Sequence, residues 1–266
     1  MKLNYCILRP RAGHEGRGYR HAGHKGRDHH AFVRLLVLLL LVVFSGVTIA
    51  GAAEDAKPPK PLTKYKGRKI APTMTYHGAD WLIRNTREQE EHCDTLIEAL
   101  KIKPGQAVCD MGCGNGFYTL RMARLVGKDG RVLAVDVQPE MLHLLDLRAK
   151  AEQIENIEPI QGTLIDPKLP EGEVDLILLV DVYHEFSHPE QMLQAMRRAL
   201  KPHGRLALVE FRLEDPEVPI KLLHKMSKAQ IMKELPPNGF KLVEEYEKLP
   251  WQHVMFFERD EEREEP

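Results

Sequence analysis

The sequence has little cysteine, and this scarcity excludes two common ways of stabilising a fold. Its four cysteines are Cys6, Cys93, Cys109 and Cys113. A disulfide framework or a structural zinc site needs paired ligands, and this spacing supplies neither. The two nearest thiols lie at the start and in the middle of a glycine-rich turn, which a bridge would distort. We therefore expect the cysteines to stay reduced.

An excess of charge of one sign is also missing. The chain has 38 lysines and arginines against 39 acidic residues, for a formal net charge of -1. This balance, without a basic stripe or a series of stacking aromatics, argues against a nucleic acid partner. Small molecules or peptides are the expected partners. With 266 residues, the chain is long enough for one large α/β domain with extensions.

The first 34 residues lack the apolar side chains that a core needs. They are rich in arginine, glycine and histidine, so residues 1–34 are expected to be a disordered basic region. Residues 35–53 carry no charge and end in small residues. This run resembles the apolar region and cleavage site of a secretory signal peptide, and it is also long enough to span a membrane as an uncleaved anchor helix. Both interpretations remain open, and an uncleaved run would contact the membrane.

The basic residues before the apolar run predict its orientation. By the positive-inside rule they stay in the cytoplasm, so the folded part would be exported or membrane-anchored outside the cytoplasm. The alternative is a cytoplasmic protein whose true start lies further along the chain. Residues 54–64, which are rich in proline and lysine, predict an extended linker. We expect a folded domain at 65–259 and a charged tail at 260–266.

Hydrophobic periodicity within the folded domain alternates between strand and helix. A helix is expected between Asp80 and Leu100, and a turn at 201–204. The strands that follow are expected at 107–110, 131–136, 158–161, 174–180 and 205–211, and the helices between them at 117–126, 139–153 and 189–200. The apolar run at 174–180 is typical of a strand buried on both faces. The alternation predicts a doubly wound, mostly parallel α/β sheet.

The end of the domain has a different pattern. Ser227 is a good N-cap for a short helix that ends before Pro236. Two strands follow, at 240–247 and 252–258, and the four residues between them are too few for a parallel crossover. These strands must therefore pair antiparallel, which gives a seven-stranded sheet that ends in an antiparallel hairpin.

A glycine-rich turn joins the strand at 107–110 to the helix at 117–126. Gly112, Gly114 and Gly116 let the backbone approach a ligand closely and direct helix N-terminal amides at it. A dinucleotide-binding fingerprint requires its third glycine one residue later, where this chain has Phe117. The spacing therefore disfavours a pyrophosphate ligand.

Two acidic residues end the strands on either side of this helix. Asp110 would repel phosphate but attract an ammonium or sulfonium group, which favours S-adenosylmethionine over NAD. Asp136 ends the next strand, where a carboxylate can accept both ribose hydroxyls. Together the loop and the two carboxylates predict a site for a positively charged adenosyl ligand.

The order of four motifs from about Tyr65 to Arg259 resembles the class I methyltransferase family, with a domain of the type 11 or type 31 kind. The motifs are Val108 to Phe117, Val135 to Leu142, Val180 to Glu185, and Leu200 to Leu206. The resemblance implies an enzyme that transfers a methyl group from S-adenosylmethionine to an acceptor, through an oxygen or a nitrogen nucleophile.

The resemblance also assigns cofactor contacts. In the family the first glycine loop contacts the methionine part of the cofactor, a role that falls here to Asp110, Gly112, Cys113 and Gly114. Asp136 takes the ribose role, with Val137 beside it. The adenine is often held by an aspartate after a glycine, whereas this chain has Thr163 and Leu164 after Gly162. A hydroxyl or the backbone would have to replace that carboxylate.

The segment after the strand at 174–180 is expected to form the chemical end of the pocket. Tyr183 and His184 are the candidate catalytic residues, because a histidine is suited to take a proton from the acceptor. Asp181 is expected near the methionine end of the cofactor. His184 and Glu185 with His188 suggest a metal, but no second cluster completes a ligand set, so no metal site is expected.

Two other functions remain open from the sequence. One is an NAD-linked oxidoreductase, against which the glycine spacing argues. The other is a non-catalytic, membrane-tethered module that binds S-adenosylmethionine without transferring its methyl group, because a fold alone does not determine an activity.

Overall fold

The computed structural model describes residues 59–262, and every structural statement below concerns these residues. The expected basic region, the apolar run at 35–53, the first part of the linker and the last residues of the tail lie outside them. Within residues 59–262, no helix is both long enough and apolar enough to cross a membrane.

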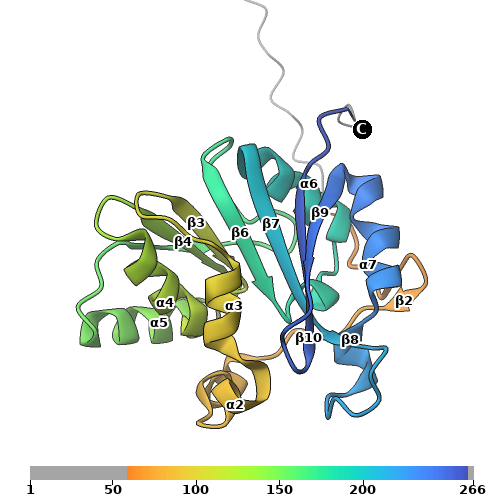
Figure 1. Ribbon diagram of the computed structural model, residues 1–266, viewed down its shortest axis with the longest axis horizontal. Helices are drawn as coiled ribbons and strands as arrows, with labels where there is room; N and C mark the ends of the chain where they lie inside the picture. The colour runs from red at the N-terminus through yellow and green to blue at the C-terminus, as the bar shows by residue number, and fades with distance from the viewer. Residues whose placement is uncertain (1–58, 263–266) are drawn as a thin grey trace, which may run out of the picture. The chain divides into compact units, whose positions relative to one another are not determined.

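One sheet organises the described domain (Figure 1). Its strands are Ala107–Met111 (β3), Arg131–Asp136 (β4), Ile157–Gln161 (β5), Val174–Val180 (β6), Leu200–Arg212 (β7), Lys225–Met226 (β8), Phe240–Tyr246 (β9) and Gln252–Arg259 (β10). They lie in the order β5-β4-β3-β6-β7-β10-β9, with β8 beside β7. All neighbours pair in parallel except β10, which is antiparallel to β7 and to β9. The expected mostly parallel sheet with a C-terminal antiparallel hairpin is confirmed, and the short β8 adds an eighth strand.

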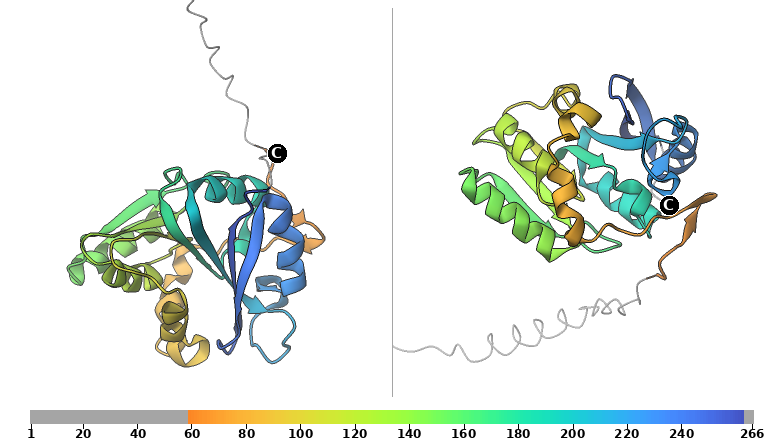
Figure 2. Two further views of the ribbon diagram at one scale, coloured as in Figure 1. Left: turned by 45° about the horizontal axis from the view of Figure 1, so that its top comes forward. Right: turned by 90° about the horizontal axis from the view of Figure 1, so that it is seen from below.

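Helices cover both faces of the sheet (Figure 2). They are Arg87–Glu91 (α2), Cys93–Ala99 (α3), Phe117–Val126 (α4), Pro139–Ala151 (α5), Pro189–Ala199 (α6) and Lys228–Glu234 (α7), with short 3-10 helices at Tyr76–Ile83 (η1), Tyr183–Glu185 (η2), Leu222–His224 (η3) and Pro236–Asn238 (η4). Because successive strand residues point to opposite faces, Val108 packs with α3 and α4, whereas Cys109 packs with α6 and α7. The buried run of β6 contributes to both clusters, as its continuous apolar sequence predicts.

Two local expectations were wrong. The single helix expected between Asp80 and Leu100 is divided into η1, α2 and α3. Arg84 leaves the helical conformation after η1, with ψ 143°, and His92 adopts a left-handed backbone with φ 51° between α2 and α3. No glycine marks this break in the sequence. The expected turn at 201–204 is instead an irregular first part of β7, where His203 has φ 64° and the register with β6 shifts. In contrast, Ser227 caps α7 as predicted, by accepting a hydrogen bond from the Gln230 amide.

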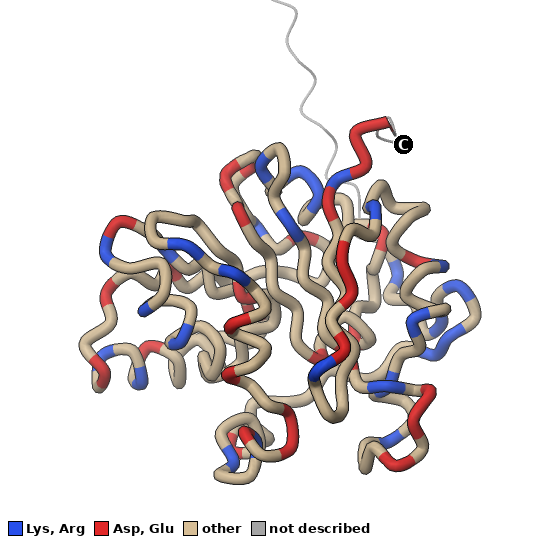
Figure 3. Tube along the Cα trace, in the orientation of Figure 1, with Lys and Arg blue, Asp and Glu red and all other residues tan. Residues whose placement is uncertain are grey.

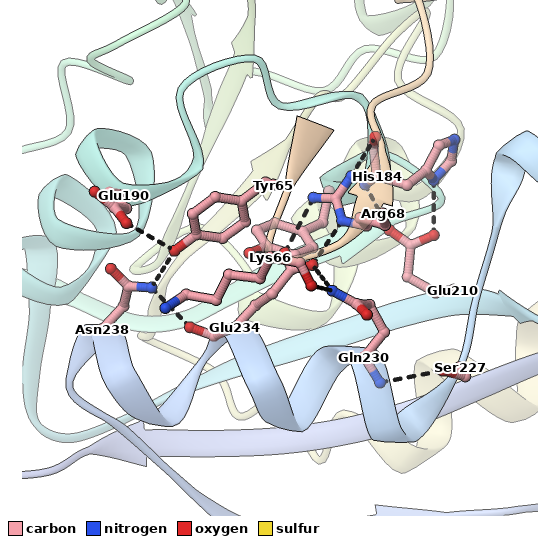
Figure 4. A network of polar contacts seen from close by, with 11 residues as sticks. Tyr65, Lys66, Arg68, His184, Glu190, Glu210, Ser227, Gln230, Glu234 and Asn238 are labelled. Carbon is pink, nitrogen blue, oxygen red and sulfur yellow. Dashed lines mark hydrogen bonds and ion pairs between the residues drawn. The ribbon is translucent and has the colours of Figure 1, made fainter. Parts of the chain in front are cut away.

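A small hairpin that the periodicity did not reveal precedes the sheet. Its strands, Lys64–Tyr65 (β1) and Arg68–Lys69 (β2), pair antiparallel. Figure 4 shows how side chains attach it to α7 and η4: the Arg68 guanidinium pairs with Glu234 of α7 at 2.7 Å, and Asn238 of η4 donates to the Tyr65 hydroxyl at 3.0 Å. The Tyr183 hydroxyl also donates to Glu234, at 2.7 Å. The Glu234 carboxylate is fully buried, so this one group holds the hairpin, α7 and η2 together.

Replacing this buried carboxylate should be costly. Glu234→Ala leaves the Arg68 guanidinium and the Tyr183 hydroxyl without their acceptor, and breaking one side of a buried ion pair costs about 3–5 kcal/mol. The solvent-accessible Asp146, which pairs with Lys150 along α5, is the matched control. Asp146→Ala should change the free energy of unfolding by no more than about 0.5 kcal/mol. Urea denaturation of wild type and the two variants measures both values. Equal stabilities of Glu234→Ala and Asp146→Ala would contradict the role of Glu234 in holding the hairpin, α7 and η2 together.

Candidate functional site

A pocket lies at the carboxyl ends of the central strands. The loops after β3, β4, β5 and β6 line it, together with the segment that contains η1, and it has about 830 Å³ of space including its mouth. The lining is mostly apolar, with Met74, Leu82, Met111, Val135, Val137, Met141, Val180, Val182, Phe186 and Met192. Open α/β sheets bind their ligands at this edge, and a mostly apolar lining with a few polar groups is typical of a small-molecule site.

The glycine loop forms one wall of the pocket. Gly112 has φ +71°, and a Cβ atom there would lie 2.4 Å from Cγ2 of Val182. The amides of Gly112 and Cys113 both donate to the carbonyl of Val135, at 2.8 and 2.9 Å. The loop is therefore held against both neighbouring strand ends. Only a residue without a side chain fits at Gly112.

The Asp136 carboxylate fixes the position of this loop. One of its oxygens accepts a hydrogen bond from the Gly114 amide at 3.0 Å, and the other accepts from the Gln138 amide at 2.9 Å. The side chain lines the pocket although the residue is only 7% exposed. Burial raises the pKa of Asp136, and the backbone donors partly oppose this shift. The carboxylate thus links the glycine loop, the end of β4 and the start of α5.

Asp110 and Cys113 lie behind the loop and do not line the pocket. The Asp110 carboxyl is buried and accepts a hydrogen bond from the Thr119 hydroxyl at 2.5 Å. Burial raises its pKa to about 6, although the Thr119 hydrogen bonds and the charge of Arg87 act in the opposite direction. The Cys113 thiol is also buried, and burial raises its pKa well above the ordinary value.

Asp181 faces the pocket from the end of β6. It has a left-handed backbone, with φ 54°, and its Oδ2 accepts from Gln252 at 3.3 Å. Its Oδ1 is buried and has no hydrogen-bond partner among the described residues. Burial and the negative charges of Glu91 and Glu210 raise its pKa well above the ordinary value.

The loop after β5 contributes Thr163 and Leu164 to the lining. The Thr163 hydroxyl accepts from the amides of Ile165 and Asp166 and donates to the Asp166 carbonyl at 3.1 Å. It is therefore occupied in shaping its own loop. Leu164 is 49% exposed, so this end of the pocket offers an apolar surface.

A segment from the N-terminal part of the domain closes the pocket. Gln138 donates to the Met74 carbonyl at 2.9 Å and accepts from the Tyr76 amide at 2.9 Å. The Met74 amide donates to Glu185 at 3.3 Å, and Asn115 donates to the Ala79 carbonyl at 2.8 Å. Met74, Leu82 and Gln138 are pocket residues that sequence reasoning missed, because only tertiary contacts bring them there.

The two candidate catalytic residues lie outside this lining. The Tyr183 ring is fully buried, with its hydroxyl donated to Glu234. The His184 ring is buried with Nδ1 2.7 Å from the Glu210 carboxylate and Nε2 3.1 Å from Nδ1 of His224. Burial by itself lowers the pKa of His184, but the charge and hydrogen bond of Glu210 outweigh it, so the net shift is upward.

Glu185 is the member of this segment that lines the pocket. Its carboxyl accepts the Met74 hydrogen bond, and burial raises its pKa to about 7. His188 lies elsewhere, with Nε2 2.9 Å from the Pro59 carbonyl and Nδ1 3.0 Å from the Ser187 hydroxyl. The group of His184, Glu185 and His188 that the sequence suggests is therefore not assembled, and His224 lies beside His184 in its place.

Figure 3 shows that positions of basic and of acidic residues are interspersed along the described chain.

Comparisons with known proteins agree with this geometry. A family model described as a methyltransferase domain matches residues 102–258, which is more than half of the chain. The ubiquinone/menaquinone biosynthesis C-methyltransferase UbiE of Vibrio vulnificus (strain YJ016) is 30% identical over 116 residues, which cover 43% of this chain and 45% of that protein. UbiE of Pseudomonas savastanoi pv. phaseolicola is 32% identical over 120 residues, with coverages of 43% and 45%. The chain spans less than half the length of the curated relatives it matches.

The fold has a counterpart among solved structures. The crystal structure of a SAM dependent methyltransferase from Aquifex aeolicus matches with a TM-score of 0.66 and 23% identity, and the match covers 70% of this chain and 98% of that one. At this identity the likeness shows the fold alone. The family match, in contrast, extends over the glycine loop, the acidic strand ends and the pocket. The chain therefore belongs to the class I methyltransferases, a family of enzymes that use S-adenosylmethionine.

Proposed function

We propose that this chain transfers the methyl group of S-adenosylmethionine to an oxygen or nitrogen atom of a small-molecule acceptor. One observation carries the proposal: the described pocket lining has three carboxyl groups and no lysine, arginine or histidine. Such a lining favours a cation and disfavours a pyrophosphate. An NAD-linked oxidoreductase must bind a pyrophosphate, which carboxylates repel, so charge and family membership argue together against it.

The pocket also fits the parts of the cofactor. The amino group of the methionine part can donate to the unpartnered Oδ1 of Asp181, beside the wall that Gly112 and Gly114 form. Asp110 and Cys113 support this wall from behind. Asp136 and Val137 are placed to hold the ribose, and Leu164 offers an apolar surface to the adenine beside the loop that Thr163 shapes.

The chemistry asks little of the protein beyond alignment. S-adenosylmethionine supplies a methyl group that is already activated on a sulfonium. The chain must exclude water, direct the acceptor atom at the methyl group and take a proton where the nucleophile carries one. The closing segment around Met74 serves the first task. His184 remains a candidate for the last task, and Glu185, which lines the pocket, becomes a second one. The Tyr183 hydroxyl donates to Glu234 and is better suited to positioning.

The acceptor itself is not transferred from the relatives. The printed name of the Vibrio protein indicates a carbon acceptor, but this chain covers only 45% of its length. A non-catalytic module that binds S-adenosylmethionine is the remaining alternative. Transfer of radiolabelled methyl groups from S-adenosylmethionine to a small-molecule extract separates it from the proposed enzyme.

Asp136→Asn should weaken binding of S-adenosylhomocysteine roughly 10- to 100-fold, which corresponds to the loss of charged hydrogen bonds. In wild type the Gly114 and Gln138 amides each donate to an oxygen of Asp136. In the variant, the asparagine NH2 group would face one of these amides and could not accept its hydrogen bond. Methyl transfer to the extract should fall in parallel. Calorimetric titration measures the affinity, with Asp129→Asn in the turn at the opposite end of β4 as control. Unchanged affinity in Asp136→Asn, or saturation by NADH, would refute the proposal.

The buried Asp110 predicts a pH-dependent cost in the free enzyme. Its folded pKa of about 6 lies above the ordinary value of 3.8, so the folded state favours the protonated form. The free-energy cost of ionising this buried carboxyl is absent below pH 3.8, grows as the pH rises and is complete above pH 6. Wild-type stability relative to Asp110→Asn should therefore fall by up to about 3 kcal/mol between pH 4 and pH 7. Denaturant titrations at several pH values give this difference, and a constant difference would show that the carboxyl ionises without cost.

The proposal extends to the location of the enzyme. Residues 35–53 would target the domain at 65–259 to the membrane, either as a cleaved signal or as an anchor that keeps the linker at 54–64 and the catalytic domain outside the cytoplasm. Mass spectrometry of the mature amino terminus should find a start near residue 53 or an intact chain in the membrane fraction. An intact chain found only in the soluble cytoplasmic fraction would contradict this targeting.

A further inference from the structure

We propose that His184, Glu185 and His224 form a binding site for a divalent transition metal of the zinc type, beside the cofactor pocket. Two 3-10 helices build the site: His184 and Glu185 lie in η2, and His224 ends η3. His184 and His224 are 40 residues apart in sequence, yet one ligand atom from each of the three residues lies within 4.8 Å of the others.

The spacing of the donor atoms suits a metal. Nε2 of His184 lies 3.1 Å from Nδ1 of His224 and 4.0 Å from Oε1 of Glu185. Two nitrogens bound to one tetrahedral zinc are separated by about 3.3 Å, because each Zn–N bond is about 2.0–2.1 Å long. The separation of the histidine pair is close to this value, and the Glu185 oxygen at 4.0 Å would have to approach by about 0.7 Å to bind the same ion. Two imidazoles and one carboxylate are a donor set that zinc accepts with an open fourth position.

Glu210 orients the central histidine. Its carboxylate lies on β7 and is fully buried, with one oxygen 2.7 Å from Nδ1 of His184 and the other accepting the His184 amide at 3.1 Å (Figure 4). Because Nδ1 donates to Glu210, the lone pair of a neutral His184 lies on Nε2 and is directed at His224. Metal-binding histidines are held by a carboxylate in this way.

Two members of the cluster line different cavities. Glu185 lines the cofactor pocket, whereas His184 lines a second, more open cavity with Arg68, Lys225 and Leu222. A metal between them would be in contact with an acceptor that enters from the open side and extends toward the methyl group. The mixture of cationic and apolar lining fits an acceptor that combines apolar surface with an ionisable hydroxyl.

The catalytic role of the metal rests on the proposed function, whereas metal binding does not. The metal would lower the pKa of the acceptor's O–H group, and its proton would leave to water. A lone pair on that oxygen then forms the bond to the methyl carbon. The bond from carbon to the sulfonium breaks, and its electron pair returns to sulfur, which leaves neutral S-adenosylhomocysteine.

The test measures metal binding directly. The full chain, purified without a histidine tag and stripped with a chelator, is titrated with Zn²⁺ against a competing chromophoric chelator. Because histidines elsewhere in the chain also bind metal, the result is the difference between wild type and His224→Ala. We expect wild type to bind one more equivalent tightly than His224→Ala does. His143→Ala, at an exposed position on α5, should keep that equivalent.

Two further measurements exclude a merely structural effect. Glu210→Gln should still bind the additional Zn²⁺ equivalent, but with an affinity about 10- to 100-fold lower, as expected for a residue that orients a metal ligand. Co²⁺ in place of Zn²⁺ should give visible absorption of a four-coordinate site in wild type and not in His224→Ala. Binding of S-adenosylhomocysteine serves as the folding control for every variant. Equal Zn²⁺ stoichiometry and affinity in wild type and His224→Ala would overturn the metal site and leave a simple hydrogen bond between the two rings. If wild type does not bind S-adenosylhomocysteine, the proposed function is refuted instead.

Discussion

The carboxylate of Asp136 is the contact on which the rest of the pocket depends. It accepts from Gly114 on one side and from Gln138 on the other, so it joins the glycine loop to the start of α5. The Gln138 side chain then binds the segment around Met74, whose amide donates to Glu185. A series of hydrogen bonds therefore runs from the end of β4 around the pocket to Glu185, which follows β6. A shift of this carboxylate would move the loop and the covering segment together.

The carboxyl groups buried around the pocket oppose folding of the protein without a ligand. Asp110, Asp136, Asp181 and Glu185 are all at least partly buried around one pocket, and burial raises the pKa of each of them. No cationic side chain lines the described pocket to offset them. A sequence selected only for stability would replace such groups, because an unpaired buried carboxyl opposes folding. Their presence is reasonable if a cationic ligand completes the site.

The parts of the fold that local patterns determine were predictable from the sequence. The strands and helices from β3 to α6 follow hydrophobic period and turn residues, and Gly112 and Asp136 lie where the motif spacing indicates. The remaining features depend on contacts between distant segments. Nothing local marks the left-handed backbone at His92, the contact of Gln138 with the covering segment, or the approach of His224 to His184. These are the features that give the site its closure and its third possible metal ligand.

The 3-10 helix η2 shows why adjacent residues could not be assigned one role from sequence. With about three residues per turn, consecutive side chains of a 3-10 helix point in directions about 120° apart. Tyr183 is directed at Glu234 and the β1–β2 hairpin, His184 at Glu210 and His224, and Glu185 at the cofactor pocket. One turn therefore contributes a side chain to the contacts of Glu234, to the histidine cluster and to the pocket. The β1–β2 hairpin contacts this turn through Arg68, which pairs with Glu234 and donates to the His184 carbonyl at 2.9 Å, so the N-terminal part of the domain contacts residues beside the pocket as well as covering it.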